Sequence, residues 1–216
     1  MPCLLCGALR SEAGLCGACR EDLIPNGPAC QRCALPLPRE GRLCGACLQR
    51  PFPLARCVAL FRFQPPLSDL VHRLKFRQQL AVARLLGGML AAHLAPLQQR
   101  PELIVPVPLH PRRLRERGYN QALELARPLA RHLGIALAPR LCRRVRATAA
   151  QTELDLRQRR RNLRHAFQVC GEVTGRHLVL LDDVMTSGST LAELARSLQR
   201  AGAARVDAWV LARAVR

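Results

Sequence analysis

Lysine is almost absent from this chain. Lys75 is the only one, so arginine supplies the other 33 of the 34 basic side chains. Aromatic residues are also scarce, at 3% of the 216 residues, so the core must be built mainly from leucine, valine and alanine. This scarcity argues against a platform of aromatic rings on which the bases of a single nucleic-acid strand would stack.

Long apolar runs are missing as well. No stretch approaches the roughly 18 consecutive apolar residues of a membrane-spanning helix, which argues against membrane insertion. No secretory signal precedes the first cysteine, so we expect a cytoplasmic location.

Acidic residues are the minority, at 15 against 34 basic ones, and the net charge is +19. This charge favours polyanionic partners, namely phosphorylated ligands at a site and nucleic acid over a wider surface. A solvated basic surface with no dedicated partner has the same composition, and charge alone gives only salt-sensitive, non-specific binding. Composition therefore leaves single-stranded DNA open as a partner.

Cysteine, by contrast, is abundant, with 11 in the chain. Each Cys-x-x-Cys pair places two thiolates on one tight turn, and two pairs complete a tetrahedral Zn²⁺ site. Four thiolates leave no open position for a substrate, so the pattern predicts two structural zinc sites. The ligands are the eight cysteines that form four such pairs: Cys3, Cys6, Cys16, Cys19, Cys30, Cys33, Cys44 and Cys47.

The order in which these pairs combine stays open at the level of sequence. Pairing in chain order keeps each loop short and is our first prediction; interleaved pairing is the alternative. Disulfides are disfavoured without a secretion signal, and an iron–sulfur cluster is a minor alternative. A module of some 50 residues buries little core, so metal binding, on the order of 10 kcal/mol per site, would supply its folding free energy.

The most informative stretch lies near the C-terminus. Residues 178–181 are all apolar and predict a parallel strand that is buried on both faces. Asp182 and Asp183 follow, a pair of carboxylates suited to ribose hydroxyls, directly or through Mg²⁺. A loop of small and hydroxylic residues then opens a helix over 189–201, where backbone N–H groups would bind a phosphate. The loop residues are Thr186, Ser187, Gly188, Ser189 and Thr190.

The rest of the chain alternates between strand and helix patterns after a cysteine-rich module at residues 1–50. We expect a second domain over residues 51–216, an α/β fold with a parallel sheet flanked by helices. Gly87-Gly88 is interpreted as a break or a bend in the first helix and Pro128 as a kink in the second. Strands are predicted at 57–63, 103–107, 135–142, 166–170, 177–182 and 205–212, and helices at 67–90, 119–133 and 189–201.

Three segments together carry a resemblance to a known family. They are IVPVPLHPRRLRERGYNQ, TAAQTELDLRQRRRN and LLDDVMTSGST, and they follow the cysteine-rich N-terminus in that order. The last resembles the phosphoribosyl pyrophosphate (PRPP) motif of type I phosphoribosyltransferases. The whole chain resembles the ComF family of phosphoribosyltransferase-like proteins, which includes competence and GntX-type members.

The resemblance implies a double zinc-ribbon-like N-terminus and roles for three regions of the second domain. The acid pair, Asp182 and Asp183, would be the catalytic residues that hold the ribose. The loop at 106–113 would bind pyrophosphate, and a mobile basic segment at 143–162 would fold over the site. The pyrophosphate ligands expected from these two regions are Pro108, His110, Arg112, Arg113, Arg157 and Arg161.

Two functions follow from the resemblance. The first is an Mg²⁺-dependent phosphoribosyltransferase acting on an unidentified acceptor and linked to competence and DNA uptake. The second is a non-catalytic factor that binds PRPP or a nucleotide together with single-stranded DNA during transformation. Either would work beside a helicase-like DNA-uptake protein. An acceptor pocket would discriminate between them, and linear sequence does not reveal one.

Overall fold

A computed structural model describes residues 2–39, 43–146 and 165–215. Its centre is a five-stranded sheet in the spatial order β1-β7-β6-β2-β3, in which every neighbouring pair is parallel. The α/β prediction is therefore confirmed. The strands are β1 (Cys57–Arg62), β7 (Arg205–Arg213), β6 (His177–Met185), β2 (Leu103–Pro106) and β3 (Ala136–Leu137).

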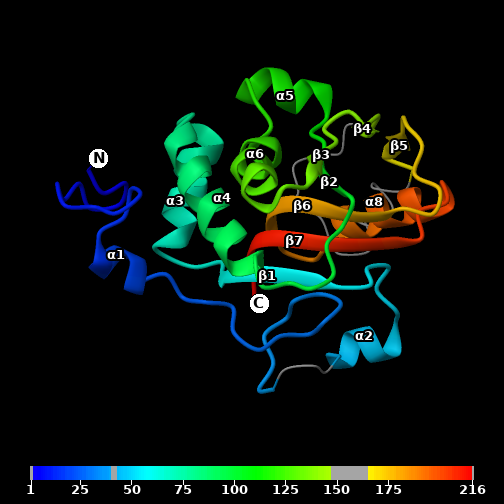
Figure 1. The fold of residues 1–216 in the computed structure, drawn as a ribbon, viewed down its shortest axis with the longest axis horizontal. Helices are drawn as coiled ribbons and strands as arrows, with labels where there is room; N and C mark the ends of the chain where they lie inside the picture. Colours follow the sequence, from blue (N-terminus) through cyan, green and yellow to red (C-terminus); the bar gives the residue numbers. More distant parts are fainter. Residues whose placement is uncertain (1, 40–42, 147–164, 216) are drawn as a thin grey trace.

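Helices cover both faces of this sheet, which is why its strands are mainly apolar on both faces. α4 (Leu80–Leu94) and α6 (Gln121–Leu133) pack on one face together with α3 (Leu67–Phe76), and α8 (Ser189–Arg200) packs on the other (Figure 1). Along β6, Val179 and Leu181 belong to the first core, and Leu178 and Leu180 to the second. Three short helices complete the described helical elements: α1 (Gly17–Glu21), α2 (Gly45–Gln49) and α5 (Pro111–Arg117).

The helix predicted over 67–90 is two helices, and the break is not at the glycine pair. α3 ends at Phe76 and α4 begins at Leu80, with Gln78 between them at a φ of 53°. Gly87 lies inside α4, where a Cβ would come within 2.5 Å of the Pro128 side chain. Its function is to allow close packing of α4 on α6. α6 runs through Pro128 without interruption.

The two adjacent glycines of α4 provide a matched pair of substitutions. Gly87→Ala should destabilise the protein by about 1–3 kcal/mol, because the new methyl group would meet the Leu125 carbonyl at 2.6 Å as well as Pro128. Gly88→Ala meets nothing within 4 Å and should stabilise by about 0.5–1 kcal/mol through helix propensity. Urea denaturation of both variants measures the difference. Equal effects would contradict the close contact.

The strand predicted at 135–142 is also divided. β3 ends at Leu137, and Pro139 lacks the N–H that a continuing strand would donate. The chain then forms β4 (Cys142–Arg144), which pairs antiparallel with β5 (Phe167–Val169) in a separate two-stranded sheet. The segment expected to be a mobile basic cover therefore begins in a strand; residues 147–162 of it lie outside the described residues.

The N-terminal cysteine segment contributes to both cores of the sheet. Cys3, Leu15 and Leu23 are buried with residues of α3, α4 and α6. Cys30, Cys33, Cys44 and Cys47 are buried with residues of α8 on the opposite face. The two halves of the segment thus brace different sides of the same sheet. Among the described residues, no helix is both long and apolar enough to span a bilayer.

Candidate functional site

A pocket of about 870 Å³ lies at the carboxyl edge of the sheet. The segments that follow β2 and β6 line it, as the pairing of Pro106 with Leu181 requires, because neighbouring parallel strands end at the same edge. The end of α3 and the strand β4 add Lys75, Phe76 and Arg144 to the wall. Phe63, which follows β1, also lines the pocket, which therefore gathers residues from five separate parts of the chain.

The acid pair lies within β6, two residues before its end. The strand continues to Met185, and Asp182 pairs with Val210 of β7. Asp183 is 3% exposed, whereas Asp182 is half-buried and lines the pocket. The backbone N–H of Asp183 donates a hydrogen bond of 2.9 Å to Asp182 Oδ1, which orients that carboxylate.

Lys75, the single lysine, forms an ion pair with Asp183. Lys75 was not among the site residues predicted from the sequence, so this partner of the acid pair was missed. The one signal in the sequence that could have indicated this role is that Lys75 is the only lysine beside 33 arginines. An ammonium is a compact point charge, which suits a single carboxylate oxygen in a confined space.

The two carboxyl groups differ in acidity as a result. Burial and the charge of Asp183 raise the pKa of Asp182 well above its usual value. Burial acts in the same direction on Asp183, but the Lys75 ammonium outweighs it and lowers the pKa of that carboxyl. Lys75 therefore favours the ionised form of Asp183, whereas burial and the neighbouring charge disfavour the ionised form of Asp182.

The predicted phosphate loop connects β6 to α8 and lines the same pocket throughout. Gly188 is the N-cap of α8 with a φ of 72°, a left-handed conformation that glycine adopts without strain. The Ser187 and Ser189 hydroxyls lie 2.9 Å apart. The first turn of α8 carries no acidic residue, so its N-terminus suits an anion.

The segment after β2 differs from the basic loop that was expected. Residues 111–117 form the helix α5, and His110 is its N-cap, with Nδ1 accepting from the Arg112 N–H at 3.3 Å. Pro108, His110, Arg112 and Arg113 all line the pocket. The Arg112 and Arg113 guanidinium groups are exposed and lie 3.1 and 3.9 Å from Glu116. They are available to an anion only in competition with this carboxylate.

Sequence reasoning did not single out two further pocket residues. Arg144 projects from β4; burial lowers its pKa, and the negative charge of Asp182 opposes that shift. Phe76 at the end of α3 is 64% exposed, and the Arg117 guanidinium lies 5.6 Å from its ring centre. Arg157 and Arg161, the remaining predicted pyrophosphate ligands, lie outside the described residues.

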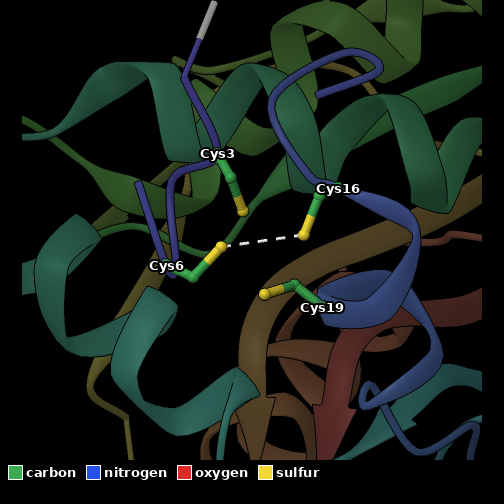
Figure 2. Close-up of side chains that lie close together, drawn as sticks. All are labelled: Cys3, Cys6, Cys16 and Cys19. Carbon is green, nitrogen blue, oxygen red and sulfur yellow. Dashed lines mark hydrogen bonds between the residues drawn. The ribbon is translucent and has the colours of Figure 1, made fainter. Parts of the chain in front are cut away.

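The eight cysteines form two clusters, and pairing follows chain order. Cys3, Cys6, Cys16 and Cys19 make the first cluster, and Cys30, Cys33, Cys44 and Cys47 the second; within each, the sulfur atoms all lie within 4.8 Å of one another. Figure 2 shows the first cluster, with its four side chains directed toward one centre. The interleaved alternative is therefore wrong.

Each cluster contains a thiol that ionises easily. Burial raises the pKa of Cys3 and of Cys30, but hydrogen bonds from backbone N–H groups outweigh it and lower these pKa values to about 6 and about 7. Thiolates are the form that binds metal. Four thiols around one centre fit a structural Zn²⁺ with a closed coordination sphere. Of the three other cysteines, Cys57 and Cys142 are buried and Cys170 is exposed.

Comparison with known proteins gives two family models that match the chain. One described as a double zinc ribbon domain matches residues 1–48, and one described as a phosphoribosyl transferase domain matches residues 120–215. DNA utilization protein YhgH of Salmonella typhimurium is 44% identical over 208 residues, covering 94% of this chain and 92% of that protein. Competence protein F of Haemophilus influenzae is 35% identical over 212 residues, with 94% and 92% coverage.

Among solved structures, a purine phosphoribosyltransferase from Pyrococcus horikoshii Ot3 is similar to this chain. It is 15% identical, the match covers 74% of this chain and 91% of that one, and the TM-score is 0.39.

Proposed function

The chain belongs to the ComF family of proteins that join a double zinc ribbon to a phosphoribosyltransferase domain, and from this premise we propose that it binds PRPP and transfers the phosphoribosyl group to an acceptor. We further propose that residues 1–50 act as a zinc-bound support for the domain over residues 51–216. Function as a PRPP-binding factor without turnover is the alternative.

One observation carries the proposal: the acid pair and the hydroxyl-rich loop open into the same pocket as the arginines of α5 and Arg144. A phosphorylated sugar with a pyrophosphate group needs all three elements at once. The loop at 186–190 suits the 5′-phosphate, the acid pair suits the ribose hydroxyls, and the arginines suit the pyrophosphate.

In the proposed reaction the bond from ribose C1 to pyrophosphate breaks, and an acceptor nitrogen forms a bond to C1. The nitrogen releases its proton to pyrophosphate or water. Positive charge develops on the sugar, where Asp182 and Asp183 oppose it. Negative charge develops on pyrophosphate, where Arg112, Arg113 and Arg144 neutralise it. We assign no residue as the base for the acceptor.

The acid pair also fits an Mg²⁺ ion that arrives with PRPP. Lys75 already occupies an oxygen of Asp183, whereas Asp182 faces the pocket with a raised pKa that a cation would reverse. Mg²⁺ is commonly held by one or two carboxylates together with substrate phosphates. Bound there, the ion would supply positive charge to the pyrophosphate, and Asp182 would be its protein ligand.

A role beside DNA is supported by the relatives and by charge. Relatives at 35–44% identity are named for DNA utilization and for competence, and the chain carries a net charge of +19. We propose that single-stranded DNA binds the basic surface and that a helicase-like DNA-uptake protein acts with this chain. Such binding should weaken steeply as salt rises, because it releases counterions from the strand.

Calorimetric titration of the full chain with PRPP and Mg²⁺ tests the proposal, with and without single-stranded DNA, followed by assay of pyrophosphate in the same samples. We expect Mg²⁺-dependent binding, and release of pyrophosphate when a pool of bases and nucleosides is added. A variant with Arg131→Met, on an α6 position outside the pocket lining, is the control for loss of positive charge.

The outcomes separate the candidates. Binding with release supports a transferase. Binding without release, with an affinity that DNA changes, supports the non-catalytic factor. An absence of PRPP binding would overturn both the transferase and the non-catalytic PRPP-binding factor.

A further inference from the structure

Arg213, the last residue of β7, is buried between the second cysteine cluster and the phosphate loop. Its side chain is 9% exposed, and its recorded partners are backbone carbonyl groups. Nε donates to the Cys33 carbonyl at 2.9 Å. Nη1 donates to Met185 at 3.0 Å and to Thr186 at 2.5 Å, and also to Ala214. One rigid guanidinium thus joins two distant segments.

The two segments that it joins have different functions. Cys33 is the second cysteine of its Cys-x-x-Cys pair, and the next residue, Ala34, has a φ of 53° that completes the turn. Thr186 is the first residue of the phosphate loop. A shift of the cysteine turn therefore moves the Cys33 carbonyl, to which Arg213 donates. Because Arg213 also donates to the Thr186 carbonyl, the start of the phosphate loop would move with it. A planar five-donor group fits this task, because its donors point in fixed directions.

Two other contacts brace the same loop from the same side. The Phe52 ring, in the chain that leaves the second cluster, packs against Gly188, where a Cβ would come within 2.7 Å of it. The Cys57 thiol lies 3.7 Å from the Met185 sulfur, just before the loop. The base of the phosphate loop is thus packed against the segment that follows the second cluster in the chain.

The first cluster has no such connection among the described residues. It packs on the opposite face of the sheet, and Arg73 of α3 donates to the Leu4 carbonyl within it. Because the two clusters are chemically alike and differ in what they contact, each serves as a control for the other.

From this geometry we infer that Arg213 is a positioning residue that couples metal occupancy of the second cluster to the order of the phosphate loop. The inference rests on the proposed function, because it names the loop as the binder of the 5′-phosphate. Coupling between two sites is reciprocal. A phosphorylated ligand in the loop must therefore raise the affinity of the second cluster for zinc by the same factor by which zinc strengthens ligand binding. Because affinity differences fall mostly on dissociation, zinc should then leave the second cluster more slowly.

Zinc release to a chromogenic chelator, with and without ribose 5-phosphate, tests the inference in the full chain. We expect ribose 5-phosphate to slow release from the second cluster about tenfold, within the range usual for coupled sites, and to leave the first unchanged. A Cys6→Ser variant, which retains one complete cluster, assigns the two phases. Slowing of both phases alike, or of neither while ribose 5-phosphate binds, would overturn the coupling.

Substitution of Arg213 separates coupling from simple stability. Arg213→Met should abolish the protection of the second zinc by ligand, and Arg213→Lys should restore part of it, because an ammonium reaches some of the carbonyls but lacks the planar fork. Arg205→Met is the matched control, at the opposite end of the same strand, where Arg205 bonds to Asp207. In Arg205→Met, ribose 5-phosphate should still protect the second zinc fully. If this variant loses the protection as well, the cause is disruption of the strand and not the loss of Arg213.

Hydrogen exchange of the unsubstituted protein provides a test that needs no ligand and no variant. Removal of the second zinc should speed exchange of the amides over 186–191 and leave those of α6 unchanged. Unchanged exchange in the loop would overturn the inference. If ribose 5-phosphate fails to bind although loop exchange responds to zinc, the proposed function fails while the coupling stands.

Discussion

Asp182→Asn and Asp183→Asn should change the stability of the protein in opposite directions, although the two residues are adjacent. Burial and Asp183 raise the pKa of Asp182, so its charged form is disfavoured in the folded state. A neutral amide at this position should therefore stabilise the protein at pH 7, because it removes the cost of placing a second buried charge beside Asp183.

The second substitution removes the partner of Lys75. The lysine side chain is 23% exposed, so its ammonium would be left unpaired and partly desolvated. We expect Asp183→Asn to destabilise the protein by about 1–3 kcal/mol for this reason. Adding Lys75→Met to Asp183→Asn should recover most of the loss, because it removes the unpaired charge. Urea denaturation of the two single variants and the double variant measures each term.

The pH dependence of the two variants follows from the signs of the shifts. Asp182 has a raised pKa, so the stability that it contributes is present below its unfolded pKa and is lost as pH rises through the folded one. Asp183 has a lowered pKa, so its contribution is present above the unfolded pKa and is lost as pH falls through the folded one. The gain from Asp182→Asn should therefore grow as pH rises from about 4, a typical unfolded aspartate value.

Both single substitutions should weaken Mg²⁺-dependent PRPP binding by at least about a hundredfold, since each removes a charged, hydrogen-bonding carboxylate from the site and such groups contribute several kcal/mol. The combination of unchanged or improved stability with lost binding in Asp182→Asn is the informative result. Retained affinity in both variants would remove the acid pair from the site.

Loss of zinc from the second cluster should have the largest effect on folding. Purified protein should contain two zinc ions per chain by elemental analysis, because both clusters have four thiols around one centre. Binding of a structural zinc contributes on the order of 10 kcal/mol, comparable with the whole stability of an ordinary domain. One zinc per chain, or iron in place of zinc, would contradict this assignment.

The two clusters should not be equivalent in this respect. All four cysteines of the second are buried in the core shared with α8, whereas in the first only Cys3 is buried. We expect Cys47→Ser to lower the thermal midpoint of the chain further than Cys19→Ser, with the sheet folded below the midpoint and one zinc retained in both. Circular dichroism and zinc content of both variants measure this, and equal losses would contradict the division between the two faces.

Much of the site was predictable because its chemistry is local. Asp182, Asp183 and the loop at 186–190 are contiguous, and a strand followed by acids, small residues and a helix allows few other structures. The cysteine pairs are also local, and their spacing alone specifies a metal-binding turn. Sequence could not decide between sequential and interleaved pairing, because that choice depends on how two separate turns approach each other.

The errors in the prediction have physical causes. The residues next to Gly87 in the sequence do not show whether this glycine breaks its helix or lets another helix approach. The position of Pro128 in the fold shows that Gly87 lets α6 approach α4. The segment after β2 was expected to be a loop, but Pro111 at the first position and the His110 cap make a short helix. Tertiary packing decided the first case, whereas local helix-start signals decided the second.

The sequence by itself determined the family, the alternation of strands and helices, the two metal-binding clusters and the identity of the acid pair, because each depends on residues that are close in the chain. Tertiary structure alone decided what surrounds them. It brought Lys75 from α3 to Asp183, placed the two clusters on opposite faces, and set Arg213 between Cys33 and Thr186. These contacts join residues far apart in the sequence, and they form only when the packing of helices on the sheet brings their backbones together.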